Sequence, residues 1–403
     1  MKTNKKEKLV PELRFPEFKE EWENSKLGNI AEFDKGKNIS KADISEDGEI
    51  ECIRYGELYT RYKEIIEKVY SQTNLDKEEL VFSEKGDVLT PSSGETAIDI
   101  ATASCINNDG VALGGDINII KSDINGNFLA YYLSNKKKAN VARLAQGVSV
   151  IHLYKNHLKS LSVNFPSPEE QQKIAIFLSL IDKKIELLKK KKELLELYKK
   201  GVMQKIFNRE IRFKDKNGND YPEWEEKRLG EIFLERSEKG FDKQELLSVT
   251  QDRGVIKRSE IEGVNNASDN RSGYKHVLPK DIVYNSMRMW QGASGLSRYE
   301  GIVSPAYTVV YPRQEESMHF YKYLFKFPRV VYNFRRYSQG LTSDTWNLKY
   351  PQFSVIRIER PNIEEQEKIA GVLINLDNLL KNIMQQSNLL KNFKRGLLQK
   401  LFI

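Results

Sequence analysis

The residue types that usually carry chemistry are scarce in this chain. Its two cysteines, Cys52 and Cys105, lie far apart with no Cys-x-x-Cys pair, which excludes a disulfide framework and a cysteine-based zinc ribbon. His152 and His157 are close in sequence, but ordinary surface or core roles explain them better than metal binding. The sequence contains no G-x-x-x-x-G-K-[ST] and no Asn-Pro-Pro-aromatic tetrapeptide, and the glycine-rich Gly110–Gly115 leads into an apolar run as a strand turn does. The chain therefore offers no ATP site and no convincing adenosylmethionine site.

One fragment resembles part of a nuclease site. Asp215 or Asp220, followed by Glu225-Glu-Lys227, provides carboxylates and an amine that could hold Mg²⁺ and a water molecule. The corresponding stretch in the other half of the chain, Trp22-Glu23-Asn24-Ser25, has no lysine. Because 30% of the residues are charged, chance explains this fragment better than catalysis does.

Polar and basic side chains form short clusters that could instead read DNA bases. Direct readout needs Arg, Lys, Asn, Gln, Ser or Thr on loops that reach base edges, with further cations on phosphates. For each single residue a solvated loop is an equally good interpretation, but the clusters recur at equivalent places in both halves. The predicted DNA-binding residues are Arg54, Tyr55, Ser92, Ser93, Lys137, Arg143, Gln146, Arg253, Asn285, Ser286, Arg288, Arg335, Arg336, Ser338, Gln339 and Thr342.

The chain repeats itself, which indicates how these clusters are positioned. Pro166 and Pro361 each open the pattern Pro-x-x-Glu-Glu-Gln-x-Lys-Ile-Ala, and the offset of 195 residues persists without a gap to Phe207 and Phe402. A second match, Trp-Glu at residues 22 and 224, lies near the start of each half. The stretches between these matches share little obvious sequence. Similar ends therefore enclose variable middles, as in a protein with two readers for different targets.

Each repeated segment is predicted to be one long helix. Ser167-Pro168-Glu169-Glu170 supplies an N-cap, a proline at the first helical position and a glutamate that completes a capping box. Asn362 and Glu365 repeat the arrangement. A helix that reaches Phe207 would measure about 58 Å at 1.5 Å per residue.

Apolar residues at alternating spacings of three and four give each helix a seam that needs a helical partner. In a duplicated chain the obvious partner is the other copy, packed antiparallel. The predicted seam consists of Leu178, Ile181, Ile185, Leu188, Leu195, Leu373, Leu376, Leu380, Ile383 and Leu390. Lys192 and Lys199 interrupt the first copy, and Ser387 and Lys394 interrupt the second copy in the same register.

The expected fold class is α/β (α+β): two similar globular domains separated by two long helices that form an antiparallel coiled coil, with the halves related by a pseudo-twofold axis. Lys85–Leu89 and Pro279–Val283 are matched turns that lead into β-branched runs, as at the start of strands. The predicted segments are a basic tail over 1–12, a first domain over 13–165, a helical region over 166–207, a second domain over 208–360 and a second helical region over 361–403.

Over nearly its whole length after the first ten residues, the chain resembles the specificity subunit of bacterial type I restriction-modification systems. The resemblance rests on the two Pro-x-x-Glu-Glu-Gln-x-Lys-Ile-Ala openings, the Gly-Asp and Lys-Asp turns at 86 and 280, the Gln-Gly loops at 146 and 339, and Leu-Arg-Phe-Pro at 13–16. Each motif alone is weak. Their recurrence in the same order makes the resemblance specific.

The resemblance implies that each globular domain is a target recognition domain that reads one half of a bipartite site on double-stranded DNA. It further implies that the paired helices set the half-site spacing and dock two methyltransferase (modification) subunits, to which motor-nuclease (restriction) subunits add. Under this interpretation the chain is a non-catalytic subunit without a cofactor or metal of its own. S-adenosylmethionine, ATP and Mg²⁺ are then expected only on partner subunits.

Net charge is a poor guide to this function. The chain carries 65 Lys and Arg against 57 Asp and Glu, a formal charge of +8 that suggests nucleic acid as a partner. However, residues 13–165 hold 19 cations and 24 anions, and residues 208–360 hold 26 and 21, so the two domains together sum to zero. We therefore expect the first domain to bind DNA poorly when isolated.

The sequence also bears on the localisation of the protein and on two alternative functions. The chain has no apolar run long enough to span a membrane and no signal peptide, so a cytoplasmic protein without a membrane partner is expected. A competing hypothesis is a coiled-coil scaffold whose two globular ends bind proteins; its binding would lack the steep salt dependence of DNA contacts. An autonomous nuclease or methyltransferase would show activity dependent on Mg²⁺ or adenosylmethionine with the chain alone.

Overall fold

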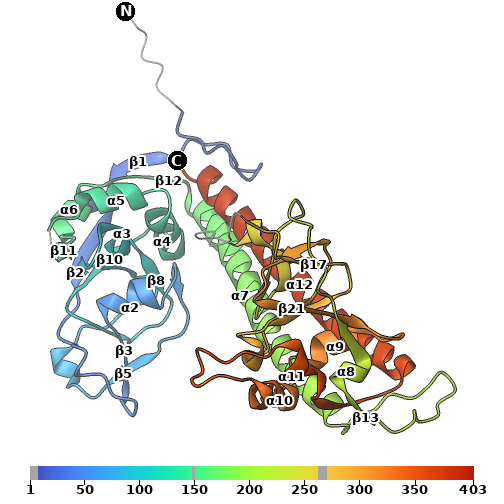
Figure 1. Cartoon of the computed structure of the whole chain (residues 1–403). Helices are drawn as coiled ribbons and strands as arrows, with labels where there is room; N and C mark the ends of the chain where they lie inside the picture. The colour runs from blue at the N-terminus through green and yellow to red at the C-terminus, as the bar shows by residue number, and fades with distance from the viewer. Residues whose placement is uncertain (1–7, 148–149, 262–269) are drawn as a thin grey trace, which may run out of the picture. The chain divides into compact units, whose positions relative to one another are not determined.

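The computed structural model describes residues 8–147, 150–261 and 270–403 (Figure 1). The chain forms two compact units: the first comprises residues up to Lys189 together with Gln385–Ile403, and the second comprises Lys190–Met384. Residues 1–7 of the predicted basic tail lie outside the described residues. The predicted segments are consecutive stretches of the chain that keep each long helix whole. The compact units instead divide both long helices, because each part of a helix packs into the core of one globular domain.

Within its described residues, the first unit contains a five-stranded sheet of order β2-β10-β6-β8-β4, antiparallel except for the parallel pair β8 and β4. Its strands are β2 (Ala31–Lys35), β10 (Ile117–Ser122), β6 (Val88–Pro91), β8 (Ser104–Ile106) and β4 (Ile65–Ile66). A three-stranded sheet consists of β5 (Ser71–Thr73), β3 (Ile50–Ile53) and β9 (Ala112–Leu113). Two strand pairs are β1 (Glu23–Lys26) with β12 (Ser162–Phe165), and β11 (Ile151–His152) with β7 (Ser93–Gly94). The short helices are α1 (Leu27–Ile30), α2 (Tyr55–Thr60), α3 (Ala97–Ile100), α4 (Gly126–Ser134), α5 (Lys138–Leu144), α6 (Lys155–Lys159) and η1 (Lys77–Glu79).

The described part of the second unit repeats this plan with a four-stranded sheet of order β14-β21-β18-β19. Its strands are β14 (Phe233–Glu235), β21 (Tyr307–Pro312), β18 (Ile282–Asn285) and β19 (Ser294–Leu296). The strand pairs are β15 (Leu247–Thr250) with β16 (Gly254–Lys257), β17 (Lys275–Val277) with β20 (Gly301–Val303), and β13 (Glu225–Arg228) with β22 (Arg357–Arg360). The short helices are α8 (Leu229–Ile232), α9 (Met318–Leu324), α10 (Pro328–Tyr337), α11 (Tyr350–Ser354), η2 (Arg258–Glu260) and η3 (Met289–Gln291).

The two predicted strand turns are confirmed and have the same construction in both units. β6 follows Gly86, whose φ is 99°, and β18 follows Lys280, whose φ is 76°. In both turns the aspartate that comes next accepts a hydrogen bond from the main-chain N–H three residues earlier, at 2.9 Å for Asp87 and 2.8 Å for Asp281. A glycine is favoured where φ is positive, but this acidic anchor allows a lysine at the second turn.

The predicted long helices are α7 (Pro168–Phe207) and α12 (Ile363–Lys400). Both continue through the matched glycines, Gly201 and Gly396, a point that the sequence leaves open. In the first unit the end of α12 packs against the start of α7, and in the second unit the start of α12 packs against the end of α7, so the helices are antiparallel within each unit (Figure 1). The expected antiparallel pairing of the two copies is thereby confirmed.

Most predicted seam residues are buried. The buried ones are Leu178, Ile181, Ile185, Leu188, Leu373, Leu376 and Ile383, whereas Leu195, Leu380 and Leu390 are partly buried. The helix ends also enter the globular cores. The ring of Phe128 lies 5.8 Å from Trp22 and 5.5 Å from Phe402. The equivalent Phe320 of the second unit lies 6.0 Å from Trp224 and 5.8 Å from Phe207.

The predicted capping boxes are only half correct. Asn362 accepts from the N–H of Glu365 at 3.0 Å, as an N-cap should. The carboxylates of Glu170 and Glu365, expected to reach back to the cap residue, instead pair with Arg14 and Arg212 at 2.7 and 2.9 Å. Both glutamates are almost wholly buried, and a buried carboxylate needs a cationic partner more than a second cap bond. These pairs attach the first residues of each globular domain to its helix.

Two matched triads explain two of the lysines that interrupt the seam, Lys199 and Lys394. In the first unit, Asp182 of α7 accepts from Lys394 of α12 at 2.7 Å and from the hydroxyl of Tyr131 at 2.6 Å. In the second unit, Asp377 of α12 pairs with Lys199 of α7 and accepts from the hydroxyl of Tyr323 at 2.6 Å. Lys199 and Lys394 therefore each meet the aspartate of the other helix copy, and a tyrosine from the globular domain completes the contact, whereas Lys192 pairs with Glu196 of its own helix at 3.3 Å.

Candidate nucleic-acid interface

The Gln-Gly loops are closed by the same pair of main-chain hydrogen bonds in both units. Gln146 exchanges N–H···O bonds with His152 at 2.9 and 2.7 Å, and Gln339 exchanges them with Asn347 at 3.0 and 2.8 Å. Gly340 has a φ of 148°, and a Cβ there would lie 2.6 Å from the carbonyl oxygen of Thr345. Only glycine fits this conformation and space. The main chain at the two Gln-Gly motifs is thus held by equivalent hydrogen bonds.

A further hydrogen bond joins each Gln-Gly loop to the loop that follows the central strand. The N–H of Leu153 donates to the carbonyl of Ser92 at 3.0 Å, and the N–H of Leu348 donates to the carbonyl of Ser286 at 2.8 Å. The loops that follow β6 and β18 carry the other predicted cluster of each half. In each unit the structure therefore brings together two clusters that are far apart in the sequence.

A group of exposed cations and half-buried aromatic rings lies in the second unit. Arg335 of α10 lies over the ring of Trp346 at 5.2 Å from its centroid, and Trp346 meets Trp290 edge to face at 5.3 Å. Arg288 is exposed two residues before Trp290, and Arg253 is exposed on the β15–β16 loop. Arginine guanidinium groups beside flat indole rings suit contacts with phosphates and with base edges. Gln339 and Thr342 are exposed on the same Gln-Gly loop, and Ser338 is half-buried at its base.

Three predicted serines are buried inside the domains. The hydroxyl of Ser286 shares a hydrogen bond of 2.8 Å with Thr308, and Ser92 lies against Asp116, with its N–H donating to that residue's carbonyl at 2.8 Å. Ser93 is buried in β7. Periodicity in the sequence does not reveal these positions, because Ser92 and Ser286 lie just past the ends of the buried strands β6 and β18 and Ser93 opens the two-residue strand β7. The burial of these three serines favours a structural role, in which they stabilise the loops, over direct contact with DNA. Asn285 acts similarly, since its side chain accepts from the N–H of Met287 at 3.0 Å.

The basic residues of the first unit divide into an exposed and a half-buried set. Arg143 and Gln146 are exposed near the Gln-Gly loop. Lys137 is half-buried with its amine 5.4 Å from the centroid of the Tyr132 ring. Burial, together with the charge of Lys136, lowers the pKa of Lys137. Arg143 is therefore the better placed of the two cations for a contact with DNA.

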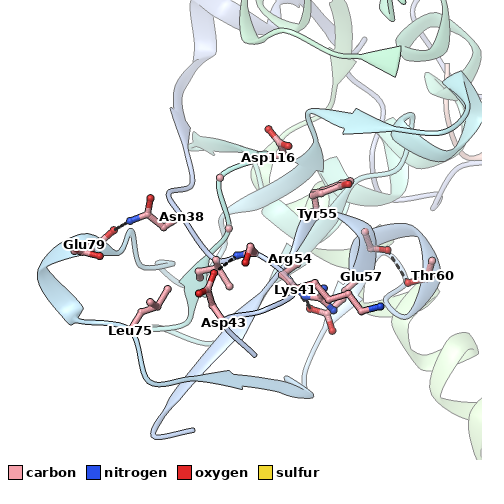
Figure 2. A pocket seen from close by; sticks show the side chains of 15 residues that line it. Asn38, Lys41, Asp43, Arg54, Tyr55, Glu57, Thr60, Leu75, Glu79 and Asp116 are labelled. Carbon is pink, nitrogen blue, oxygen red and sulfur yellow. Dashed lines mark hydrogen bonds and ion pairs between the residues drawn. The ribbon is translucent and has the colours of Figure 1, made fainter. Parts of the chain in front are cut away.

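Arg54 and Tyr55 line a separate hollow of about 1120 Å³ (Figure 2). The buried carboxylate of Glu57 accepts from the main-chain N–H of Arg54 at 3.0 Å and from the side chain of Arg61 at 3.2 Å. Asp116 also lines the hollow, so it adjoins the loop that contains Ser92. The lining combines carboxylates, cations and a tyrosine, which gives it mixed polarity rather than a cationic character.

Arg336 points to a different place from its neighbour Arg335. It lines a cavity of about 260 Å³ together with Trp224, Arg357 and Glu359. The cavity adjoins the end of α7, since Phe207 also lines it. Arg336 is therefore separated from the Trp290–Trp346 group.

The nuclease-like fragment has an ordinary structural explanation. Asp215 accepts from the N–H groups of Asn217 and Asn219 at 2.8 Å each, in a tight turn. These hydrogen bonds, first that from Asn219, lower the pKa of Asp215. Asp220 pairs with Lys214 at 3.4 Å, and Glu225 pairs with Lys227 at 3.3 Å. Within residues 8–147, 150–261 and 270–403, no group of three or more His, Cys, Asp or Glu side chains is arranged to hold a metal ion.

Sequence reasoning missed two residues of this interface. Trp346 lies between Arg335 and Trp290, and Lys326 donates to the carbonyls of Gln251 and Gly292. The aromatic residue could have been found, because it follows the Gln-Gly motif by a few positions. The lysine has no such signal in the sequence.

The chain contains two similar domains, and each domain packs against both long helices. In each domain a hydrogen bond joins the two loops that carry the predicted clusters. This duplicated arrangement is that of a recognition protein. The family model "Type I restriction modification DNA specificity domain" matches residues 19–197 and 221–392. The chain belongs to this family of specificity subunits, the non-catalytic components of restriction-modification systems. No helix within the described ranges is long and apolar enough to cross a membrane.

Relatives and solved structures agree with this assignment. The chain is 24% identical to the type I restriction enzyme MjaVIII specificity subunit of Methanocaldococcus jannaschii, over 98% of this chain and 95% of that protein. The type I restriction-modification S subunit from M. genitalium matches with a TM-score of 0.62 at 17% identity, over 98% and 99% of the two chains. A structure from a study of type I complex assembly matches with a TM-score of 0.52 at 15% identity, over 94% and 97%. These structural likenesses concern the fold.

Proposed function

We propose that this chain is the sequence-specific DNA recognition subunit of a type I restriction-modification complex, and that each unit reads one half of a bipartite site. The linked loops carry the proposal. Leu153 and Leu348 donate equivalent hydrogen bonds that join the Gln-Gly loop to the loop after the central strand. The construction is the same in both units while the side chains on the loops differ, as two readers of different half-sites require.

The two long helices are proposed to set the separation of the half-sites. Each unit contains a part of α7 and a part of α12, so neither helix belongs to a single reader. The triads around Asp182 and Asp377 attach each globular domain to both helices. A domain held in this way keeps a fixed place along its helices, as a ruler needs.

The helices are also proposed to dock two methyltransferase subunits. Leu194 and Tyr198 of α7 are 57% and 61% exposed, and the matched Leu389 and Phe393 of α12 are 69% and 53% exposed. Residues four apart share one face of a helix, so each pair forms a small apolar patch. An apolar patch that occurs twice, once in each unit, suits two copies of one partner.

No cofactor is assigned to this chain. Adenosylmethionine, ATP and Mg²⁺ are proposed to bind partner methyltransferase and motor-nuclease subunits in the cytoplasm. The purified chain should then neither cut nor methylate DNA with any of them.

Sequencing of modified bases tests the proposed function. DNA from cells that express this chain with its methyltransferase should carry a methylated motif in two parts separated by a spacer of fixed length. The absence of a bipartite motif would contradict the proposal. The scaffold alternative makes a different prediction, because binding through several phosphate contacts should weaken steeply between 50 and 200 mM salt, by roughly 10³-fold or more.

A further inference from the structure

Lys326 is a largely buried lysine whose amine serves two main-chain carbonyls. It lies between α9 and α10, and its Nζ donates to the carbonyl oxygen of Gln251 at 2.9 Å and to that of Gly292 at 2.5 Å. The hydrogen bonds are charge-assisted on the donor side, which makes them stronger than bonds between neutral groups. The amine thus joins two segments that are about forty residues apart in the chain.

The two segments are those that carry exposed arginines of the candidate interface. Gln251 begins the β15–β16 turn that carries Arg253, and Gly292 ends the η3 turn that begins beside Arg288. The side chain of Gln251 adds a third link, because its Nε2 donates to the carbonyl of Gln291 at 3.1 Å. Gly292 has a φ of 80°, so the carbonyl that Lys326 holds belongs to a left-handed turn.

Burial disfavours the charged form of this amine. Burial, assisted by the charge of Lys322 and opposed by that of Asp252, lowers the pKa of Lys326 to about 8. A buried cation disfavours its charged form because it has lost hydration. A neutral group could have filled the same place, and in the first unit one does.

The equivalent residue of the first unit is Ser134. Tyr131 and Tyr323 make the matched bonds to the helix aspartates, and Ser134 and Lys326 each follow three residues later. Ser134 accepts from the N–H of Ala103 and donates to the carbonyl of the same residue, both at 2.8 Å. A neutral hydroxyl there fixes one segment, whereas the longer, charged lysine fixes two.

We propose that Lys326 is a positioning residue for DNA recognition by the second unit. By holding the carbonyls of Gln251 and Gly292 together, it fixes Arg253 relative to Arg288, and the second half-site is read only while both loops are held. This inference rests on the proposed function, since it assumes that these loops face DNA. The charged amine is the stronger donor, so discrimination of the second half-site decreases as pH rises from 7 to 9.

The test uses the full chain with its methyltransferase and duplexes that contain the motif identified by sequencing. Affinity is measured for the intact site, for a duplex with the second half scrambled and for one with the first half scrambled. Lys326→Met should reduce discrimination of the second half about tenfold and leave that of the first half unchanged. Lys239→Met, which removes an exposed lysine of the same unit, is the matched control and should change neither ratio.

A pH series separates positioning from a merely structural role. Second-half discrimination by the unmodified chain should decrease about tenfold from pH 7 to pH 9, while first-half discrimination serves as an internal reference. If Lys326→Met folds, it should have no such pH dependence. Unfolding by urea checks that Lys326→Met remains folded under the assay conditions, so that a change in second-half discrimination reports the lost loop contacts rather than loss of the unit.

The outcomes are distinguishable. If the unmodified complex recognises no bipartite site, the proposed function fails. If it recognises one but Lys326→Met discriminates both halves normally, the positioning role is overturned. If Lys326→Met does not fold, the pH series of the unmodified chain decides, and a flat second-half ratio between pH 7 and 9 overturns the proposal.

Discussion

The Nζ of Lys394 lies 2.7 Å from Oδ2 of Asp182, which ties the end of α12 to the start of α7 in the first unit. The duplication places Asp377 and Lys199 at the matched positions, and these residues pair in the second unit. The same ion pair is thus made twice with the helices exchanged. In each case a buried tyrosine of the globular domain donates to the aspartate. One short polar contact therefore orients three elements at once.

Neutralising this aspartate should destabilise the first unit. Asp182→Asn leaves Lys394, which is only 13% exposed, with Glu64 at 3.5 Å as its remaining acidic partner. We expect a decrease of about 1–3 kcal/mol in the free energy of unfolding, measured with urea. Lys183→Met, a change at an exposed neighbour, should have little effect. An unchanged stability of Asp182→Asn would show that the triad does not stabilise the unit.

The matched aspartate predicts a dependence of stability on pH. Burial opposes ionisation of Asp377, but hydrogen bonds from Lys199 and Tyr323 and the charges of Lys199 and Lys322 outweigh it, so its pKa is lowered. Its contribution to stability is therefore complete above about pH 4, the ordinary value of the unfolded chain, and is lost as pH falls through the lower folded value. Asp377→Asn should unfold with a weaker acid dependence between pH 5 and pH 2 than the unmodified chain. Equal slopes for the two proteins would refute this assignment.

Changes at the loop arginines should affect one half-site each. Arg288→Ala should relax the preference at one base pair in one half of the methylated motif, at a cost of about 1–3 kcal/mol in discrimination if the arginine contacts a base edge. Arg143→Ala should act on the other half. Sequencing of modified bases with each variant gives both results. A single substitution that relaxes both halves would contradict independent readers.

The apolar patches on the helices predict a change in stoichiometry. Leu389→Glu with Phe393→Glu should reduce the complex from two methyltransferase subunits to one, because only one of the two matched patches is removed. Adding Leu194→Glu and Tyr198→Glu should abolish the remaining docking. Mass photometry measures the assembly directly, and Leu180→Glu, at an exposed leucine with no matched apolar residue, is the control. Retention of two subunits by the first double variant would locate the docking surface elsewhere.

Longer helices should recognise a longer spacer. Seven residues inserted after Lys189 and seven after Met384 preserve the seam and add about 10 Å, near three base pairs at 3.4 Å each. The methylated motif should keep both half-sites and gain about three base pairs between them. An insertion in α7 alone should impair the seam and serves as the control. A motif with its original spacer would reject the ruler.

The sequence predicts most of the scaffold because local signals suffice there. The cap residues, the apolar alternation and the repeat define α7 and α12 almost to the residue. The role of Lys199 and Lys394 was not predictable, because their partners come from the other helix and from tyrosines in the globular domains. The same reason explains Glu170, which fits a local capping box but pairs with Arg14. The carboxylate of Glu170 could bond either to the local cap residue or to the distant Arg14, and in the structure it forms the buried ion pair with Arg14.

The candidate interface was predicted less completely. The clusters around Arg288 and Gln339 were identified as loops, but the sequence does not distinguish an exposed arginine from a buried serine beside it. Ser286 and Arg288 illustrate this, since two positions separate a core hydroxyl from a free guanidinium. The sequence does not single out Lys326, because its burial depends on segments far away in the chain. Side-chain type predicts what a residue can do, and the fold decides whether it is in a position to do it.

The division of the chain into units has a consequence for its synthesis. The core of the first unit includes Leu397, Leu401 and Phe402, and Phe402 packs against Phe128 and Tyr132 at 5.5 and 5.6 Å. The ribosome makes these residues after the whole of the second unit has been synthesised. The first globular domain must therefore wait through most of translation with part of its apolar core exposed, while the second unit can fold first. A nascent chain of this kind is a natural client for chaperones, and its solubility should depend on how quickly α12 is released from the ribosome.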